Sequence, residues 1–443
     1  MLIASDLSIQ SALAYLGCMW AGLVAVPVDT AGLRESLPGL LQNTGAKAIW
    51  VRTEDIVPQG SGSEQILTAV GDISKEMGGF DPQQRDESAL AALMATSGTT
   101  GGTRFVMVTH GNLLSNTQAI VRSQHLQNEE RAMLVLPIHY CFGASVLHSH
   151  LAVGGSVVFD RRFMFPDKVL RAITTYKCTT FAGVPLAYRA LARRSNIASL
   201  PLPSLRRFLQ AGGALDRETI QAIRKFVPKA DFYVMYGQTE ATARLSCLDP
   251  AELDRKLGSV GRPLDNVEVQ IVNEAGEIFP NGMNGEIFVR GPSVSPGYWG
   301  DPIHTAEVFC DGWLKTGDLG HLDDEGYLWV DGRKSAFIKI RGRRIGLTEI
   351  EAKVAEVPGV TECAAVAMPH SEAGEAIGLF IVSDCESESG LEARVADALP
   401  SNWDCLFVRR VDSLPRTASG KLSRAGVSLL VQQTPESEHG HKH

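Results

Sequence analysis

The sequence predicts an α/β protein with a large N-terminal domain built of α/β subdomains, a β-rich, barrel-like subdomain, and a small α+β domain at the C-terminus. Three observations support this fold class. Short apolar runs alternate with helical patterns up to about residue 258, which is typical of α/β architecture. Beyond that point short strands alternate with glycine turns. The last hundred or so residues mix strand and helix patterns again.

In the first part of the chain, short apolar runs bounded by turn residues predict strands, and longer amphipathic stretches predict helices. The expected strands are 23–28, 48–51, 90–95, 156–160, 180–184 and 231–235. The expected helices are about 10–20, 112–123, 167–176, 185–195 and 216–226.

One uncharged segment, 11–28, is long enough to suggest a membrane helix. Acidic residues flank it, a basic start is missing, and Gly22 and Pro27 interrupt its second half. We therefore interpret it as a buried helix followed by a buried strand, and we expect a cytoplasmic protein without a membrane span.

The β-rich part contains the strand patterns VEVQIV, GEIFVRG, GWLKTGDLG and GYLWVDG. After it comes a basic stretch, KSAFIKIRGRR, and then a helix for which Thr348 and Glu351 have capping-box spacing. A strand is expected at 360–369, a helix at 389–398 and a strand at 405–411. The histidine-containing end, 439–443, is expected to be a disordered polar tail.

Composition excludes several classes of protein. The 443 residues are 44% hydrophobic and 21% charged, which excludes wholesale disorder, and the length alone predicts about three domains. The net charge of −8 argues against nucleic acid as the main partner. The 8 cysteines are scattered, so neither a disulfide scaffold nor a zinc ribbon is expected. Glycine is in excess, with 43 residues, and several of these glycines lie in the motifs described next.

The densest motif is the glycine- and threonine-rich loop that begins at Thr96 and precedes a predicted helix. Glycines and hydroxyls let backbone amides approach phosphate oxygens closely. The loop lacks the Gly-Lys-Ser/Thr ending of a Walker A motif. Considered alone, it is compatible with either a phosphate-binding loop or a flexible polar turn.

Further motifs follow in order. Residues 236–240, Tyr-Gly-Gln-Thr-Glu, come directly after a predicted strand, where α/β proteins gather ligands. Residues 316–319, Thr-Gly-Asp-Leu, offer a carboxylate that we expect in a turn and that suits two sugar hydroxyls. Gly332-Arg333 follows another strand, and residues 416–421 place a lysine after a glycine near the C-terminus.

Together these motifs resemble the adenylate-forming superfamily, which contains the acyl-CoA synthetases, the adenylation domains of peptide synthetases, and the luciferases. The resemblance extends from Ala21-Gly22 to Lys421, and several motifs in the same order make it specific. It implies a two-step reaction. A carboxylic acid and ATP give acyl-AMP and pyrophosphate, and a thiol of CoA or of carrier-protein phosphopantetheine then displaces AMP. Mg²⁺ and cationic side chains are needed because the carboxylate and ATP are both anionic and must be brought together.

The resemblance also implies residue roles. The phosphate loop, with Arg104 where the family usually has lysine, would hold the β- and γ-phosphates. Tyr236 and Gly237, with a glycine-rich segment, would hold adenine. For the phosphate loop the residues are Thr96, Ser97, Gly98, Thr99, Thr100 and Gly101, and for the adenine segment Gly212, Gly213 and Ala214.

The remaining implied roles concern catalysis and the ribose. Thr239 would contact the α-phosphate, and Glu240 would hold Mg²⁺. Asp318 and Arg333 would bind the ribose. Lys421 would bridge the carboxylate and the α-phosphate during adenylation.

The resemblance further implies a mobile C-terminal domain that swings between the two half-reactions. The expected domains are 1–334, which binds AMP, and 335–430, with a tail at 431–443; the hinge is Ser335. The basic loop 339–344 would face the thiol donor, unless it is only a solvated hairpin. Members of the superfamily normally carry several dozen more residues before the first helix, so we expect the usual first segment to be lacking.

The acid pocket is expected to include two segments of the N-terminal domain. Its candidate residues are His139, Tyr140, Gly143, Gly183 and Val184. Amino-acid-activating relatives place an aspartate in the first segment to pair with the substrate ammonium, and residues 136–145 contain none. An uncharged acyl tail is therefore favoured. A stand-alone amino-acid adenylating enzyme and a catalytically silent nucleotide-binding relative remain as alternatives.

Overall fold

The fold was obtained as a computed structural model, which describes residues 1–443 except 54–64, 69–84, 98–102, 335–336, 341–342, 371–373, 384–389, 401–402, 404, 417–421 and 433–443. The chain divides into two compact units. The larger unit comprises Met1–Thr96, Thr103–Thr316 and Gly320–Val330. The smaller unit comprises Ser97–Gly102, Gly317–Leu319 and Asp331–His443. The expected boundary after residue 334 stays a prediction.

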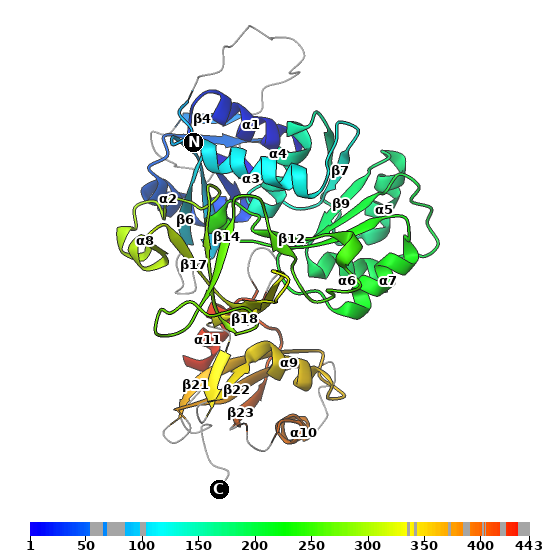
Figure 1. The fold of residues 1–443 in the computed structure, drawn as a ribbon, viewed down its shortest axis with the longest axis vertical. Coiled ribbons are helices and arrows are strands. Elements are labelled where there is room, and N and C mark those ends of the chain that lie inside the picture. Colours follow the sequence, from blue (N-terminus) through cyan, green and yellow to red (C-terminus); the bar gives the residue numbers. More distant parts are fainter. Residues whose placement is uncertain are drawn as a thin grey trace. The chain divides into compact units, whose positions relative to one another are not determined.

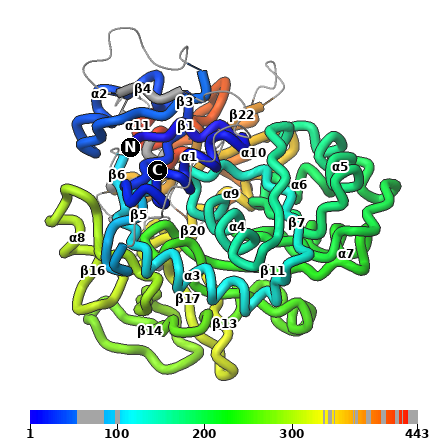
Figure 2. The backbone as a smooth tube through the Cα atoms, turned by 90° about the horizontal axis from the view of Figure 1, so that it is seen from above, coloured from blue at the N-terminus to red at the C-terminus, as the bar shows by residue number. Residues whose placement is uncertain are grey.

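The larger unit begins with a parallel sheet whose strand order is β2-β1-β3-β4. Its strands are β1 (Leu2–Ser5), β2 (Val26–Asp29), β3 (Ala48–Val51) and β4 (Gln65–Thr68). Helices α1 (Ile9–Trp20) and α2 (Thr30–Thr44) connect its first strands, and Figure 2 shows α2 beside β3 and β4.

The uncharged segment 11–28 divides into a helix and a strand, as expected. Helix α1 ends because Gly22 takes a left-handed φ of 70° and the Leu23 amide closes on the Cys18 carbonyl. The strand β2 starts at Val26, three residues later than predicted. Within the residues the structure describes, no helix is both long enough and apolar enough to cross a membrane.

The central sheet of the larger unit has the strand order β13-β12-β11-β10-β9-β7-β8. The strands from β11 to β8 are parallel, and β12 and β13 add antiparallel pairs at one edge. The strands are β7 (Arg131–Leu134), β8 (Ser156–Phe159), β9 (Thr180–Gly183), β10 (Arg207–Gln210), β11 (Asp231–Tyr236), β12 (Ser246–Leu248) and β13 (Arg262–Pro263).

Helices connect these parallel strands and cover the sheet. Right-handed crossovers place α4 on one face and α5, α6 and α7 on the other, because α4 runs from β7 to β8 in the opposite direction along the sheet. Figure 1 shows α5, α6 and α7 gathered beside β9. The helices are α3 (His110–Ser123), α4 (Cys141–Ala152), α5 (Pro166–Thr175), α6 (Pro185–Arg194) and α7 (Arg217–Phe226).

The predicted β-rich region forms a further sheet, in the order β14-β15-β17-β16 with β18 paired to β17. Its elements are β14 (Glu268–Val272), β15 (Gly285–Arg290), α8 (Pro302–Val308), β16 (Phe309–Cys310), β17 (Trp313–Leu322) and β18 (Leu328–Arg333). The strands β5 (Leu90–Ser97) and β6 (Thr103–Thr109) pair separately on either side of the glycine-rich loop.

Two expectations about this region need correction. Residues 316–319 were expected in a turn, but they continue strand β17, and Gly317 accommodates a φ of 70° within it. The neighbouring strand provides the reason, because the Thr316 hydroxyl donates to the Ile287 carbonyl of β15 at 2.7 Å. Similarly, Gly332-Arg333 ends strand β18 instead of following it.

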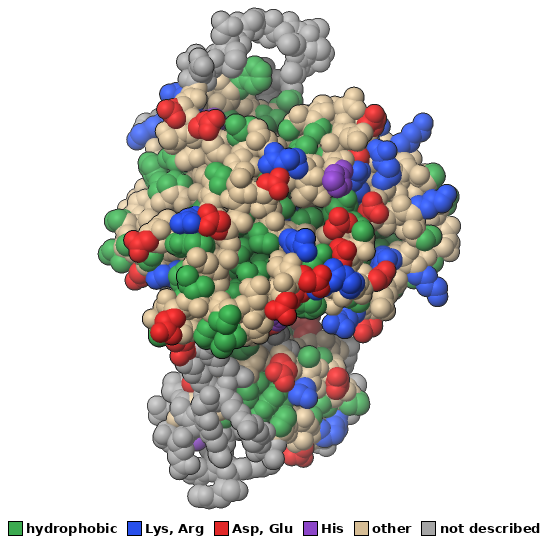
Figure 3. Space-filling model, viewed as in Figure 1, with side chains coloured by type: hydrophobic (Ala, Val, Ile, Leu, Met, Phe, Trp, Pro, Cys, Tyr) green, Lys and Arg blue, Asp and Glu red, His purple; other side chains and the backbone are tan. Residues whose placement is uncertain are grey.

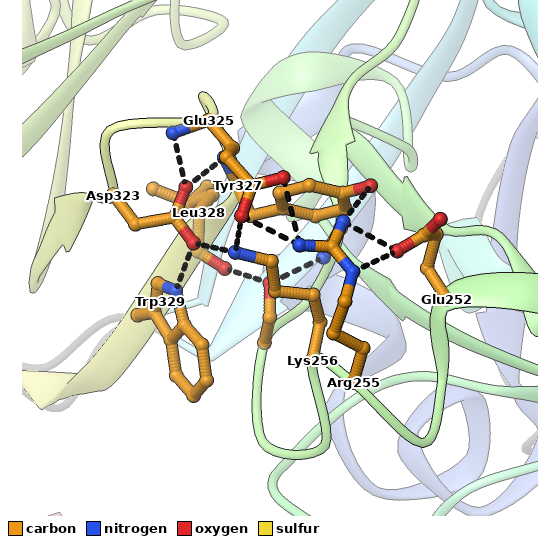
Figure 4. Close-up of polar contacts among 10 residues, drawn as sticks. Glu252, Arg255, Lys256, Asp323, Glu325, Tyr327, Leu328 and Trp329 are labelled. Carbon is orange, nitrogen blue, oxygen red and sulfur yellow. Dashed lines mark hydrogen bonds and ion pairs between the residues drawn. The ribbon is translucent and has the colours of Figure 1, made fainter.

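A polar network fastens the β17–β18 connection to the segment that follows the short helix η3 (Pro250–Glu252) (Figure 4). The Lys256 ammonium donates to Asp323 and to Glu325, each at 2.7 Å. The Arg255 guanidinium donates to Glu325 and to Glu252. These charge-assisted bonds hold the turn between β17 and β18 against the segment 252–256 within the larger unit.

The smaller unit is an α+β fold with the sheet order β20-β19-β22-β21 and β23 beside β22. Its apolar core contains Ile338, Ile350, Leu379 and Ile381. Its elements are β19 (Phe337–Ile340), β20 (Arg343–Gly346), α9 (Leu347–Ala355), β21 (Glu362–His370), β22 (Gly374–Val382), α10 (Leu391–Ala398), β23 (Cys405–Arg410) and α11 (Arg424–Gln432).

The capping-box prediction for the helix near residue 348 is wrong. Helix α9 begins at Leu347, its N-cap is Gly346, and the cap has no side-chain hydrogen bond. Glu351 forms tertiary hydrogen bonds instead of capping the helix. Its carboxylate accepts two hydrogen bonds from Arg424 of α11, at 2.5 and 2.8 Å, and one from the Ala365 amide of β21. A charged partner on a distant helix therefore outweighs the local cap.

Candidate active site

The candidate residues of the larger unit converge at one edge of the central sheet. The segments 137–143, 183–184, 212–214 and 236–240 follow strands β7, β9, β10 and β11, which are neighbours and parallel. Parallel strands bring their carboxyl ends to a common edge, where α/β folds bind ligands. Residues as far apart in the chain as Cys141 and Thr239, 98 positions, therefore contribute to one site.

Glycines allow the close approaches that this edge requires. A Cβ on Gly237 would lie 1.7 Å from the Ala243 carbonyl oxygen, and one on Gly143 would lie 2.2 Å from the Pro137 carbonyl oxygen. Gly212 and Gly213 adopt φ values of 81° and 148°, which L side chains avoid. The Gln210 side chain donates to the Gly213 carbonyl at 2.7 Å and fixes this loop.

The catalytic candidates lie in a short 3-10 helix, η2 (Thr239–Ala241), directly after β11. The Tyr298 hydroxyl donates to the Glu240 carboxylate at 2.9 Å, and the Glu240 carbonyl accepts from the Ser295 amide at 2.9 Å. The Thr239 hydroxyl donates to the Cys141 Sγ at 3.5 Å. Both candidates are partly exposed, so each can reach a ligand.

A cation lies on the other side of the same tyrosine. The Arg104 guanidinium lies over the Tyr298 ring, 5.9 Å from its centroid, and its Nε is 3.5 Å from the Asp301 carboxylate. Tyr298 therefore holds a carboxylate at its hydroxyl and a guanidinium at its ring. A carboxylate suits Mg²⁺, and a guanidinium suits phosphate oxygens.

Within the smaller unit the structure brings together the two ribose candidates. Arg333 Nε lies 2.8 Å from the Asp318 carboxylate, which is only 5% exposed. This pairing orients the carboxylate, whose remaining lone pairs can accept from hydroxyls.

The candidates for the acid pocket include a buried histidine, and their role as a pocket stays a prediction. His139 packs against Tyr140 with ring centroids 4.4 Å apart. Burial lowers the pKa of His139 to about 4, against the opposing influence of Asp29, so the ring is neutral at pH 7. Gly183 ends β9 and Val184 caps α6 at the same sheet edge.

Several predicted residues lie outside the described part of the chain. These are Gly98, Thr99, Thr100 and Gly101 of the phosphate loop, the hinge Ser335, Lys421, and the histidine-containing tail. For Ser97 only the backbone, at the end of β5, is described, whereas Thr96 is half-buried in the same strand.

Sequence reasoning missed residues that complete the site. Tyr298, Ser295 and Asp301 contact the candidates Glu240 and Arg104 from a different part of the chain. Arg244, the lone charge in the otherwise uncharged segment ATARLSC, follows the 236–240 motif closely and was not singled out either. Within the described residues, no cluster of three or more His, Cys, Asp or Glu side chains could hold a metal ion.

This fold and site define an adenylate-forming enzyme, and the chain belongs to the AMP-binding enzyme family. Residues 1–299 match the AMP-binding enzyme family and residues 349–421 match the AMP-binding enzyme C-terminal domain. The reaction is ATP-dependent activation of a carboxylic acid to acyl-AMP, with release of pyrophosphate, followed by transfer to a thiol. The predicted fold class and reaction class are confirmed.

The chain is similar to curated CoA ligases. It is 34% identical to feruloyl-CoA synthase of Amycolatopsis, over 76% of this chain and 68% of that protein. It is 33% identical to indoleacetate–CoA ligase of Aromatoleum aromaticum, over 85% of this chain and 73% of that protein.

Solved structures show the same fold. O-succinylbenzoate CoA synthetase of Bacillus subtilis, in complex with its acyl-adenylate, matches with a TM-score of 0.81 and 26% identity, over 95% of this chain and 86% of that one. ATP-bound MatB of Rhodopseudomonas palustris matches with a TM-score of 0.81 and 27% identity, over 98% of this chain and 88% of that one.

Proposed function

We propose that this protein is an AMP-forming acid–CoA ligase whose acid carries no ammonium group. The observation that carries this proposal is the placement of Glu240 and Arg104 on the two sides of Tyr298. A magnesium triphosphate requires a carboxylate and a cation side by side, and this chain supplies both on neighbouring elements. CoA is proposed as the thiol because the similar curated proteins are named CoA ligases and CoA synthases.

The residues fit Mg²⁺ by the chemistry of their donors. The Glu240 carboxylate stands at the site, and Mg²⁺ typically binds through one or two carboxylates together with phosphate oxygens and water. When bound, the ion would neutralise phosphate charge. Tyr298 orients the Glu240 carboxylate, and Arg104 would neutralise a second phosphate oxygen.

For the nucleotide, we assign the remaining roles as follows. Tyr236 would stack on adenine beside Gly237 and the 212–214 loop, whose glycines admit a flat ring. The Asp318 carboxylate, held by Arg333, would accept from the ribose hydroxyls. Thr239 would donate to the α-phosphate, and the loop that begins at Thr96 would hold the outer phosphates.

The remaining assignments follow from family membership. Lys421 would bridge the attacking carboxylate and the α-phosphate, and Ser335 would be the hinge of the C-terminal domain. The hairpin of β19 and β20, in which Ile340 pairs with Arg343, would present its basic loop to CoA phosphates in the second half-reaction.

The test is acid-dependent exchange of labelled pyrophosphate into ATP, across aryl, aliphatic and amino acids. We expect Mg²⁺-dependent exchange with acids that lack an ammonium group, and release of AMP when CoA is added. Exchange only with amino acids would overturn the proposal in favour of a peptide-synthetase adenylating enzyme. Exchange with no acid would favour a catalytically silent relative. Thioester formation on a carrier protein but not on CoA would reassign the acceptor.

A further inference from the structure

The chain turns sharply after the short helix η2, and the backbone of this turn is strained. Thr242 and Ala243 have φ values of 56° and 101°, in a region that residues other than glycine rarely adopt. Such a backbone costs free energy and persists only where neighbouring contacts hold it. The turn directly follows Thr239 and Glu240, to which we assign the α-phosphate and Mg²⁺, so a change in its course would move both side chains.

One distant side chain holds the end of this turn. Hydrogen bonds within the turn fix its beginning, because the Ala243 amide donates to the Gln238 carbonyl at 3.2 Å. At Arg244 both backbone groups bind Asn116 of helix α3. The Asn116 side chain accepts from the Arg244 amide at 3.2 Å and donates to its carbonyl at 2.7 Å. Asn116 is only 3% exposed, so both bonds are shielded from water.

Helix α4 binds side chains of the same turn. The Arg244 guanidinium lies over the Phe142 ring, 4.7 Å from its centroid, and the Thr239 hydroxyl donates to Cys141 Sγ at 3.5 Å. These contacts pack side chains against α4, and they do not involve the backbone of the turn. The course of the backbone therefore depends on α3, through Asn116.

A second asparagine of α3 binds the other segment that reaches Glu240. Asn112 lies four residues before Asn116, on the same face of the helix. Its side-chain amide donates to two backbone carbonyls of the segment 292–295, at 2.8 and 3.0 Å. From the same segment the Ser295 amide donates to the Glu240 carbonyl at 2.9 Å. One face of α3 therefore anchors both segments that hold Glu240.

We propose that Asn116 is a positioning residue for the formation of acyl-AMP. By holding the strained turn, it keeps the Thr239 hydroxyl and the Glu240 carboxylate at the spacing that an α-phosphate and its Mg²⁺ require. The inference rests on the proposed ligase function and adds to it a residue that acts through the turn. The expected effect on the rate is large, because a displacement of about 1 Å at a reacting group can cost about a hundredfold.

The first test removes the two hydrogen bonds of Asn116 and measures Mg²⁺-dependent exchange of pyrophosphate into ATP. In Asn116→Ala we expect kcat to fall about 10- to 100-fold. We also expect the Mg²⁺ concentration that gives half-maximal exchange to rise, because the Glu240 carboxylate is displaced. This concentration does not depend on how much of the enzyme is folded, so a loss of stability alone would not change it.

Ser259→Ala is the matched control. The Ser259 hydroxyl is fully buried, donates to the Leu328 carbonyl at 2.7 Å and accepts from the Gly261 amide at 3.0 Å. Its removal therefore also deletes one donor and one acceptor bond to the backbone, and we expect a similar fall in Tm without a change in exchange or in the Mg²⁺ requirement. If Asn116→Ala does not fold, Asn116→Asp replaces it, because it keeps the size and the acceptor for the Arg244 amide but lacks the donor.

The second test relieves the strain itself. Ala243→Gly places at a φ of 101° a residue that adopts this value freely, so the turn should depend less on Asn116. We expect the double variant Asn116→Ala/Ala243→Gly to exchange at least about threefold faster than Asn116→Ala, with a lower Mg²⁺ requirement. Ala243→Gly alone should change exchange by less than about twofold, because Asn116 still holds the turn.

The outcomes separate this inference from the function on which it rests. Wild-type exchange and an unchanged Mg²⁺ requirement in Asn116→Ala would overturn the role of Asn116 and leave the ligase intact. Equal losses of exchange in Asn116→Ala and Ser259→Ala, with an unchanged Mg²⁺ requirement, would make Asn116 a structural residue. A double variant no faster than Asn116→Ala would overturn the role of the strained turn. Exchange by the wild-type enzyme with no acid at all would overturn the ligase function and the inference together.

Discussion

Tyr298 links the two charges that the proposed chemistry requires. Its hydroxyl orients Glu240 and its ring lies under Arg104, while residues 295 and 301 of the same segment bind Glu240 and Arg104 in turn. Because these contacts constrain both side chains before ligand arrives, less reorganisation is needed when charge develops in the reaction.

Substitutions of Glu240 and Tyr298 should separate the binding of Mg²⁺ from the orientation of the Glu240 carboxylate. Glu240→Gln keeps the shape but removes the charge, and we expect pyrophosphate exchange to fall about 100-fold, with a higher Mg²⁺ requirement. Tyr298→Phe removes one hydrogen bond, and a loss of about 1 kcal/mol predicts roughly fivefold slower exchange. Exchange rates measured against Mg²⁺ concentration test both. An unchanged Mg²⁺ dependence in Glu240→Gln would contradict the assignment.

At the scale of elements, the turn after β11 depends on one glycine. Gly237→Ala would place a methyl group 1.7 Å from a backbone oxygen, so the turn must shift, at a cost of about 1–3 kcal/mol and with loss of exchange activity. Gly17→Ala is the matched control, because Gly17 lies in α1 with nothing within 4 Å of the added methyl. Urea unfolding should show this control stabilised by about 0.5–1 kcal/mol. Equal effects would refute the steric argument.

Asp323, in the connection between β17 and β18, should make the free energy of unfolding depend on pH. Burial disfavours the charged form of Asp323, but hydrogen bonds from Lys256, the Tyr327 amide and Trp329 outweigh it and lower the pKa of Asp323 to about 2. Because the folded pKa is below the ordinary value, the stabilisation is complete above about pH 4 and is lost as pH falls toward 2.

Asp323→Asn tests this dependence. We expect the variant to be less stable than wild type by roughly 1 kcal/mol at pH 7, with the difference shrinking between pH 4 and 2. Unfolding free energies at several pH values give the measurement. Glu268→Gln, in an exposed pair with Arg290, should change stability by less than about 0.5 kcal/mol. A pH-independent deficit in Asp323→Asn would mean that packing, and not charge, is responsible.

At the scale of the whole molecule, the two half-reactions should depend on different parts of the chain. Lys421→Ala should abolish acyl-AMP formation, because a cation at the two anionic reactants would be missing, while thioester formation from supplied acyl-adenylate stays largely intact. Lys353→Ala, in helix α9 of the same unit, should leave both steps unchanged. Assaying the half-reactions separately tests the assignment, which fails if Lys421→Ala retains both.

The surface of the larger unit carries charges of both signs. On the face drawn in Figure 3, basic and acidic side chains of the larger unit are interspersed, in keeping with the net charge of −8. A small anionic substrate therefore depends on local cations such as Arg104, because overall charge does not attract it.

Much of the fold was predictable because its signals are local. Helix α7 and its Asp216 cap, strand β11 and the 236–240 motif all lie within short windows of sequence. Predictions failed where a distant partner decided the outcome. Glu351 pairs with Arg424, 73 residues away, and residues 316–319 continue a strand because β15 lies beside them.

The sequence by itself determined the family, the reaction class and the order of the motifs, because each motif is contiguous and carries its own chemistry. Only the tertiary structure decided which charges are paired. Tyr298 reaches Glu240 across 58 residues, and Asn116 holds Arg244 across 128. Burial and pairing depend on contacts between distant segments, which no short window of sequence contains. Gly237, one of the many glycines, shows both contributions. The sequence places it in a motif, and only the fold puts the Ala243 carbonyl against it.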